Sequence, residues 1–104
     1  MLDKKTVKKI ASRYAEEVKK ILAPAAIVVF GSYINGTPHE WSDIDIAVIM
    51  RDFQGNWLET AAALCGLTRR VSIDIEPHLL DEAHDASGFV KYVLKTGEFV
   101  YKAA

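Results

Sequence analysis

Two acidic side chains stand at the start of an otherwise apolar stretch of this sequence. In the segment SDIDIAVIM, at positions 42–50, Asp43 and Asp45 are separated by a single residue. If the segment is a β-strand, its side chains alternate between two faces, so both carboxylates lie on one side, about 7 Å apart along the strand. Burial of such a pair would cost hydration and bring like charges together, unless a cation accompanies them.

A second stretch of acidic and apolar residues follows later in the chain. The segment RRVSIDIE, at 69–76, predicts another strand, which Pro77 would end. Asp74 and Glu76 would share one face of it. Taken alone, Asp74 could equally form a salt bridge with a neighbouring arginine, and Asp43 could be a strand-entry residue. If the two strands are neighbours, three or four carboxylates converge, and oxygen ligands of this kind bind Mg²⁺ and Mn²⁺.

A Gly-Ser pair lies between the first apolar run and the acids. Gly31 directly follows AAIVVF, at 25–30, where the lack of a side chain lets a ligand approach the backbone. Ser32 can cap the turn SYING, and the free N–H groups of such a turn suit a phosphate. An ordinary tight turn also explains this pair. Its fixed place ahead of the acids favours the phosphate-binding role.

Apolar spacing and turn residues predict the elements that must position these side chains. Three helices are predicted: one from an N-cap at Asp3 to Pro24, one from Gly55 and Asn56 to about Leu67, and one over 87–95. The predicted strands cover 25–30, 43–50, 69–76 and 98–102, and a turn is predicted at 35–38. This order predicts an α/β (α+β) fold in a single domain over 1–104. We expect a small mixed sheet, mainly antiparallel at its edges, packed against helices.

The composition narrows the class of partner. Thirteen basic and fourteen acidic residues nearly cancel, so nucleic acid is not expected as the main partner. No apolar run approaches the roughly 20 residues of a membrane span, and the N-terminus lacks the apolar core of a signal peptide. We therefore expect a cytoplasmic protein without a membrane partner. The single cysteine, Cys65, is expected to be a small buried thiol in the 57–67 helix.

The segment GSYINGTPHEWSDID has the pattern Gly-Ser, ten residues, Asp-x-Asp. Together with the order of elements around it, this pattern resembles the nucleotidyltransferase superfamily typified by DNA polymerase beta. The resemblance covers nearly the whole chain, and it is greatest to the minimal nucleotidyltransferases (MNT), the antitoxins of HEPN/MNT toxin–antitoxin modules. It implies the nucleotidyltransferase fold, triphosphate binding by Gly31 and Ser32, and catalysis through Asp43 and Asp45 as ligands of two Mg²⁺ ions, or of Mn²⁺ in their place.

The resemblance also implies a third catalytic, metal-binding carboxylate on the third strand. Asp74 fits the apolar-Asp-apolar pattern best, and Glu76, on the same face, remains the alternative. Two aromatic residues of the loop, Tyr33 and Trp41, could stack on a base, but cover of the core is the preferred interpretation. His78, which follows Pro77 close to the third-strand acids, could touch a phosphate, but a plain loop residue is the preferred interpretation.

The implied reaction transfers a nucleoside monophosphate from a nucleoside triphosphate to a hydroxyl, and ATP is the favoured donor. Because 104 residues leave no room for the extra domains of larger nucleotidyltransferases, the acceptor is expected to be a macromolecule. The resemblance implies a HEPN-domain toxin as acceptor, with this chain as a protein adenylyltransferase-like antitoxin. The alternative is a catalytically weak or inactive nucleotide-binding module that neutralises a partner protein by direct binding.

Overall fold

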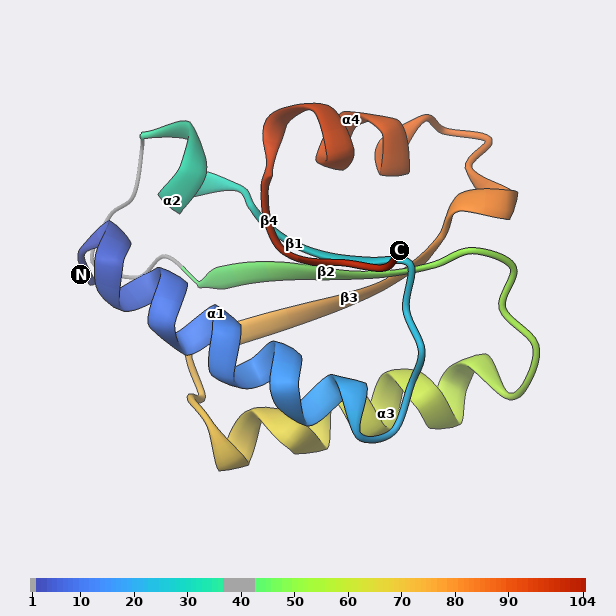
Figure 1. The fold of residues 1–104 in the computed structure, drawn as a ribbon, viewed down its shortest axis with the longest axis horizontal. Coiled ribbons are helices and arrows are strands. Elements are labelled where there is room, and N and C mark those ends of the chain that lie inside the picture. Colours follow the sequence, from blue (N-terminus) through green and yellow to red (C-terminus); the bar gives the residue numbers. More distant parts are fainter. Residues whose placement is uncertain (1, 37–42) are drawn as a thin grey trace.

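The computed structural model describes residues 2–36 and 43–104, and Figure 1 shows their fold. In chain order the elements are α1 (Lys4–Lys19), β1 (Ala26–Phe30), α2 (Ser32–Asn35), β2 (Ile44–Met50), α3 (Trp57–Leu67), the 3₁₀ turn η1 (Thr68–Arg70), β3 (Ile75–Asp81), the 3₁₀ turn η2 (Glu82–His84), α4 (Phe89–Thr96) and β4 (Glu98–Lys102). The predicted turn at 35–38 extends into residues outside the described ranges, and Trp41 lies wholly outside them.

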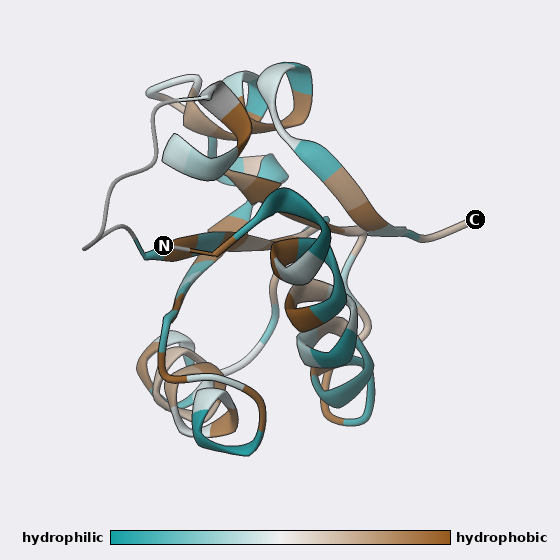
Figure 2. Ribbon diagram, turned by 90° about the vertical axis from the view of Figure 1, so that its left-hand side faces the viewer, coloured by the Kyte–Doolittle hydropathy of each residue, from teal (hydrophilic) through white to brown (hydrophobic). Residues whose placement is uncertain are grey.

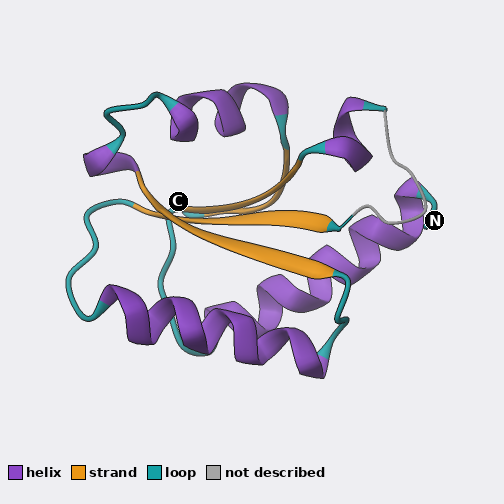
Figure 3. Ribbon diagram, turned by 180° about the vertical axis from the view of Figure 1, so that it is seen from behind, coloured by secondary structure: helices purple, strands orange, loops and turns teal. Residues whose placement is uncertain are grey.

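The four strands form one mixed sheet in the order β3-β2-β1-β4. β1 is antiparallel to both of its neighbours, whereas β2 and β3 are parallel. Helices α1 and α3 cover one face of the sheet, and α4 covers the other (Figures 1 and 3). The α/β fold predicted from the sequence is therefore confirmed, including the C-terminal edge strand β4.

The alternation of side chains along the central strands divides the core into two layers. Ile27 and Ile46 belong to the layer under α1 and α3, whereas Val28 and Ile49 belong to the layer under α4. The hydroxyl of Tyr14 on α1 donates a hydrogen bond of 2.6 Å to the Leu64 carbonyl oxygen, which ties α1 to α3. Figure 2 shows hydrophobic residues along the strands, and helices whose ribbons alternate between hydrophilic and hydrophobic residues.

The third strand differs from its predicted position. It begins at Ile75 and continues to Asp81, so that Pro77 lies inside it rather than at its end. The predicted first part, 69–74, instead contains the end of η1 and a turn. Proline is tolerated because β3 is an edge strand with a partner on only one side, where a missing N–H need not break the ladder.

Helix α3 is less buried than its sequence predicts. Leu64 is almost fully buried, but Cys65 is exposed, and Leu58 is 80 % exposed. The prediction of a buried thiol was wrong because α3 packs chiefly on β3, at the edge of the sheet, where only a narrow stripe of the helix meets the core. Among the described residues, no helix is long and apolar enough to cross a membrane.

Candidate active site

Two acidic side chains meet where β2 and β3 begin. Asp45 and Glu76 are direct partners in the parallel register, so their side chains lie on the same face of the sheet, the one that α4 covers further along. Ligand atoms of Asp45, Glu76 and His78 lie within 4.8 Å of one another. We call these three residues the β2–β3 entry group. The predicted convergence of carboxylates from two neighbouring strands is therefore present in the structure.

Asp43 and Asp74 lie just outside the two strands. Asp43 is exposed directly before β2, and its carboxylate is close enough to Glu76 to affect the pKa of that residue. Asp74 is exposed in the turn before β3, where its carbonyl oxygen accepts a 2.7 Å hydrogen bond from the Ile44 N–H. The backbone of Asp74 thus joins the two strands, but its carboxylate is not among the ligand atoms of the entry group.

His78 belongs to the entry group, although the preferred interpretation of the sequence was a plain loop residue. Its Nε2 atom lies 3.1 Å from Oδ1 of Asp45, and its ring meets that of Phe30 edge to face, with the centroids 5.0 Å apart. The assignment to a loop was wrong because β3 continues past Pro77. A signal was available, since Glu76 and His78 repeat the two-residue spacing of Asp43 and Asp45.

Charges at the entry group are unbalanced. Loss of hydration raises the pKa of Glu76 above its ordinary value, and repulsion from Asp45 and Asp43 adds to the rise. The hydrogen bond to Asp45 raises the pKa of His78 despite the opposing effect of burial. Among the described residues, the two carboxylates of the group and the nearby Asp43 carboxylate are accompanied by one imidazole, that of His78. This excess of negative oxygen donors fits a divalent cation.

The turn after β1 passes directly beside Asp45. Gly31 has a φ of +83°, and a Cβ atom at this position would overlap the Asp45 carboxylate, reaching 3.2 Å from its Cγ atom and closer still to an oxygen. Gly31 is also the N-cap of α2, so Ser32 is the first helical residue and not the cap that we predicted. The Gly-Ser turn and Asp45 of β2 are thus brought together.

Tyr33 belongs to the core rather than to an open surface. It is 7 % exposed, and its hydroxyl accepts a hydrogen bond of 3.4 Å from the Leu2 N–H. This burial confirms the preferred interpretation of Tyr33 as an aromatic residue that covers the core.

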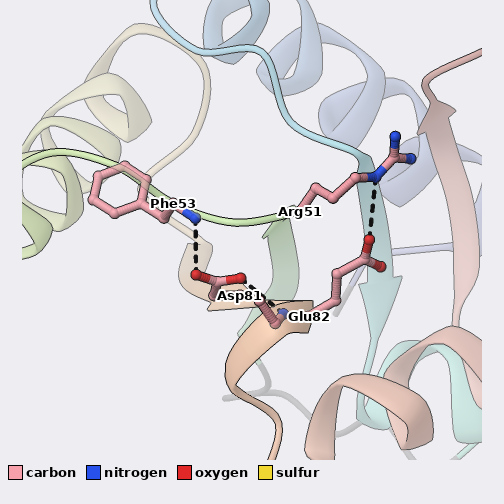
Figure 4. Close-up of polar contacts among 5 residues, drawn as sticks. Arg51, Phe53, Asp81 and Glu82 are labelled. Atoms are coloured by element: carbon pink, nitrogen blue, oxygen red, sulfur yellow. Dashed lines mark hydrogen bonds and ion pairs between the residues drawn. The ribbon is translucent and has the colours of Figure 1, made fainter.

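A second acid–histidine group lies at the opposite end of β2 and β3. Ligand atoms of Asp52, Asp81 and His84 also lie within 4.8 Å of one another. Asp81 is buried, and its two oxygens accept hydrogen bonds of 2.9 Å from the backbone N–H groups of Phe53 and Ala83 (Figure 4). These hydrogen bonds lower the pKa of Asp81, and the bond from the Phe53 N–H has the largest effect. We call these three residues the β2–β3 exit group.

Comparison with known proteins identifies the family. A family model described as polymerase beta, nucleotidyltransferase, matches residues 5–104. No curated protein matches the sequence. The solved structures with a similar fold include a candidate nucleotidyltransferase from Sulfolobus solfataricus, with 22 % identity and a TM-score of 0.67 over 93 % of this chain and 81 % of that one.

Other similar structures are toxin–antitoxin complexes. One contains AMP-PNP, and its matching chain has 27 % identity and a TM-score of 0.60 over 88 % of this chain and 73 % of that one. Another is a tri-AMPylated Shewanella oneidensis HEPN toxin bound to an MNT antitoxin, with 23 % identity and a TM-score of 0.58 over 92 % and 73 % of the two chains. These matches agree with the resemblance to minimal nucleotidyltransferases. Because the family model spans all but the first four residues, the chain belongs to the polymerase beta nucleotidyltransferase family.

Proposed function

We propose that this protein is a metal-dependent nucleotidyltransferase that transfers a nucleoside monophosphate, with AMP from ATP as the favoured case, to a hydroxyl of a HEPN-type partner protein and thereby acts as its antitoxin. The observation that carries the proposal is the approach of the Gly31 turn to Asp45, beside Glu76. It brings a turn suited to a triphosphate next to carboxylates suited to a metal ion. Two similar proteins support the choice of donor and partner, since one was solved with AMP-PNP and another with an AMPylated HEPN toxin.

In this proposal the backbone around Gly31 and the hydroxyl of Ser32 hold the triphosphate. A residue with a side chain could not take the place of Gly31, because its Cβ atom would meet Asp45. The phosphates would therefore lie against bare backbone, close to the carboxylates. Such close positioning is the main contribution that a protein makes to phosphoryl transfer.

Asp43, Asp45 and a third acid would hold the metal ions, for which Mg²⁺ is the expected species. Divalent ions of this kind neutralise phosphate charge and make the attacking oxygen more nucleophilic. Glu76 is better supported as the third acid than Asp74, because it is the register partner of Asp45. Asp74 remains the alternative, since its backbone adjoins the start of β2.

The residues also account for the movement of the proton. The acceptor oxygen forms a bond to the α-phosphorus, and the bond from this phosphorus to the oxygen that bridges to the β-phosphate breaks. Pyrophosphate leaves with that bridging oxygen and its electron pair. In this proposal the acceptor proton moves to the carboxylate of the third acid, for which Glu76, the register partner of Asp45, is the better supported residue.

The test uses labelled ATP, Mg²⁺ and a HEPN-domain partner, with the product of the adjacent reading frame as first choice. Wild type is compared with Asp45→Asn, Glu76→Gln and Asp74→Asn. We expect labelled partner with wild type, none with Asp45→Asn, and a far greater loss with Glu76→Gln than with Asp74→Asn. The reverse order of the last two variants would assign the third carboxylate to Asp74.

The second candidate is a nucleotide-binding module that neutralises its partner by contact alone. It is supported by the same fold, because the nucleotide site and the partner surface need no turnover. If wild type and Asp45→Asn bind the partner equally and neither transfers label, this candidate replaces the enzyme.

A further inference from the structure

We propose that His78 is a direct ligand of the divalent metal ion, together with Asp45 and Glu76, and that it shifts the ion preference of the site from Mg²⁺ towards Mn²⁺. The proposal rests on the metal site of the proposed function. It adds a nitrogen ligand to a site that the sequence predicts to contain oxygen ligands only.

The positions of the ligand atoms carry the proposal. Nε2 of His78 and Oδ1 of Asp45 are 3.1 Å apart, and a Glu76 oxygen lies within 4.8 Å of both. Adjacent ligands of an octahedral ion with bonds of about 2.1 Å are about 3 Å apart. The same two atoms that form a hydrogen bond can therefore share an ion with little movement of either side chain.

The backbone and a neighbouring ring hold His78 in this place. Glu76 and His78 occupy alternate positions of β3, so both face the side of the sheet on which Asp45 lies. Phe30, which is 7 % exposed, packs its ring edge to face against the imidazole, with the ring centroids 5.0 Å apart. The His78 side chain is still 29 % exposed, so an ion can reach it from solvent.

Nitrogen changes the selectivity of the site. Mg²⁺ strongly prefers oxygen ligands and keeps several waters, whereas Mn²⁺ and the later divalent metals bind imidazole more readily. A set of two carboxylates and one imidazole thus favours Mn²⁺ over Mg²⁺ more than a set of carboxylates alone. Because a ligating imidazole must offer a lone pair at Nε2, the proton then resides on Nδ1.

The test measures Mn²⁺ binding to the whole chain by electron paramagnetic resonance, without nucleotide or partner. Electron spin-echo modulation reports whether a nitrogen is bonded directly to the ion. Wild type is compared with His78→Gln and with the matched control His84→Gln, which removes the histidine of the exit group. A wild-type sample containing ¹⁵N-histidine identifies the origin of the signal.

We expect ¹⁴N modulation in wild type and in His84→Gln, its replacement by ¹⁵N modulation in the labelled sample, and its loss in His78→Gln. The Mn²⁺ affinity of His78→Gln should fall about 10-fold or more, with little change in Mg²⁺ affinity. If Mn²⁺ binds to wild type without nitrogen modulation, or if the modulation survives in His78→Gln, His78 is not a ligand.

These outcomes separate this proposal from the proposed function. Mn²⁺ bound without nitrogen modulation, together with label transfer to the partner, overturns the role of His78 and leaves the enzyme. Nitrogen modulation without label transfer supports the role of His78 and overturns the enzyme. No Mn²⁺ binding at all overturns the metal site itself.

Discussion

The two ends of the β2–β3 strand pair contain similar residues in different chemical states. The entry group combines two acids and a histidine, Asp45, Glu76 and His78, and the exit group does the same with Asp52, Asp81 and His84. In both groups the ligand atoms lie within 4.8 Å of one another. Distance and composition alone would therefore assign a metal site to both ends.

Hydrogen bonding distinguishes the two groups. In the exit group, backbone N–H groups and the His84 ring bind the buried Asp81 carboxylate, and its pKa is lowered. In the entry group, Glu76 faces other carboxylates, and its pKa is raised. A carboxylate whose oxygens already accept hydrogen bonds stabilises a turn, whereas a carboxylate surrounded by like charge is stabilised when it binds a cation. We therefore interpret the exit group as structural.

The largest expected effect comes from Asp45→Asn, which removes a proposed metal ligand and its charge from the entry group. Nucleotidyl transfer to the partner should fall by at least about 100-fold, since the metal ion that would neutralise the phosphates loses a charged ligand. The matched exit-group variant, Asp52→Asn, should keep wild-type activity in the same labelled-ATP assay. Equal losses in both variants would mean that the exit group also takes part in the reaction.

Gly31→Ala should be the next most damaging change. The positive φ costs about 1–2 kcal/mol for any residue with a side chain, and the added methyl group displaces the Asp45 carboxylate. Gly36→Ala is the control, because it has a similar φ of +79° and no atom of the described residues lies within 4 Å of the added Cβ. Thermal unfolding should show a comparable loss of stability from backbone strain in both variants. Only Gly31→Ala should also lose Mn²⁺ affinity. Equal Mn²⁺ affinities would show that the close approach to Asp45 is not needed.

Asp81→Ala tests the structural role of the exit group. It leaves two backbone N–H groups without their acceptor, so we expect a loss of about 1–3 kcal/mol in the free energy of unfolding. For a domain of this size each kcal/mol lowers Tm by about 4–8 °C. Nucleotidyl transfer measured well below Tm should be unchanged. A variant of normal stability with impaired transfer would reverse our assignment of the exit group.

The smallest effect is expected from Glu76→Gln, on the thermal stability of the metal-free protein measured as a function of pH. Because the folded-state pKa of Glu76 is raised, its contribution to stability is fully present below the ordinary value of 4.5 and is lost as the pH rises through the folded-state pKa. The variant should therefore unfold at a slightly higher temperature than wild type near neutral pH, and the difference should vanish below pH 4.5.

Metal supplies the control for this last variant. Addition of Mn²⁺ should stabilise wild type more than Glu76→Gln, so that wild type then has the higher unfolding temperature. An unchanged order would argue that Glu76 does not contact the ion.

Much of the site could be predicted from local patterns. The Gly-Ser pair and the alternating acids at 43–45 are adjacent in the sequence, and the helices and most strands carry their own periodicity and caps. Asp3, for example, caps α1 as expected, with its side chain accepting a 2.7 Å hydrogen bond from the Thr6 N–H. Features of this kind depend on a few consecutive residues, and a single sequence therefore contains them.

The partners across the sheet were decided by tertiary structure. Whether Asp74 or Glu76 lies beside Asp45 depends on the register of two strands far apart in the chain, and a shift of one residue would turn every side chain to the other face. The same register extends β3 beyond Pro77 and brings His78 to the entry group. It also places Asp81 where donors from two loops saturate it. The sequence by itself determined which residues could do chemistry, and the packing of the sheet decided which of them share a site, because pairing energy comes from contacts that no local segment contains.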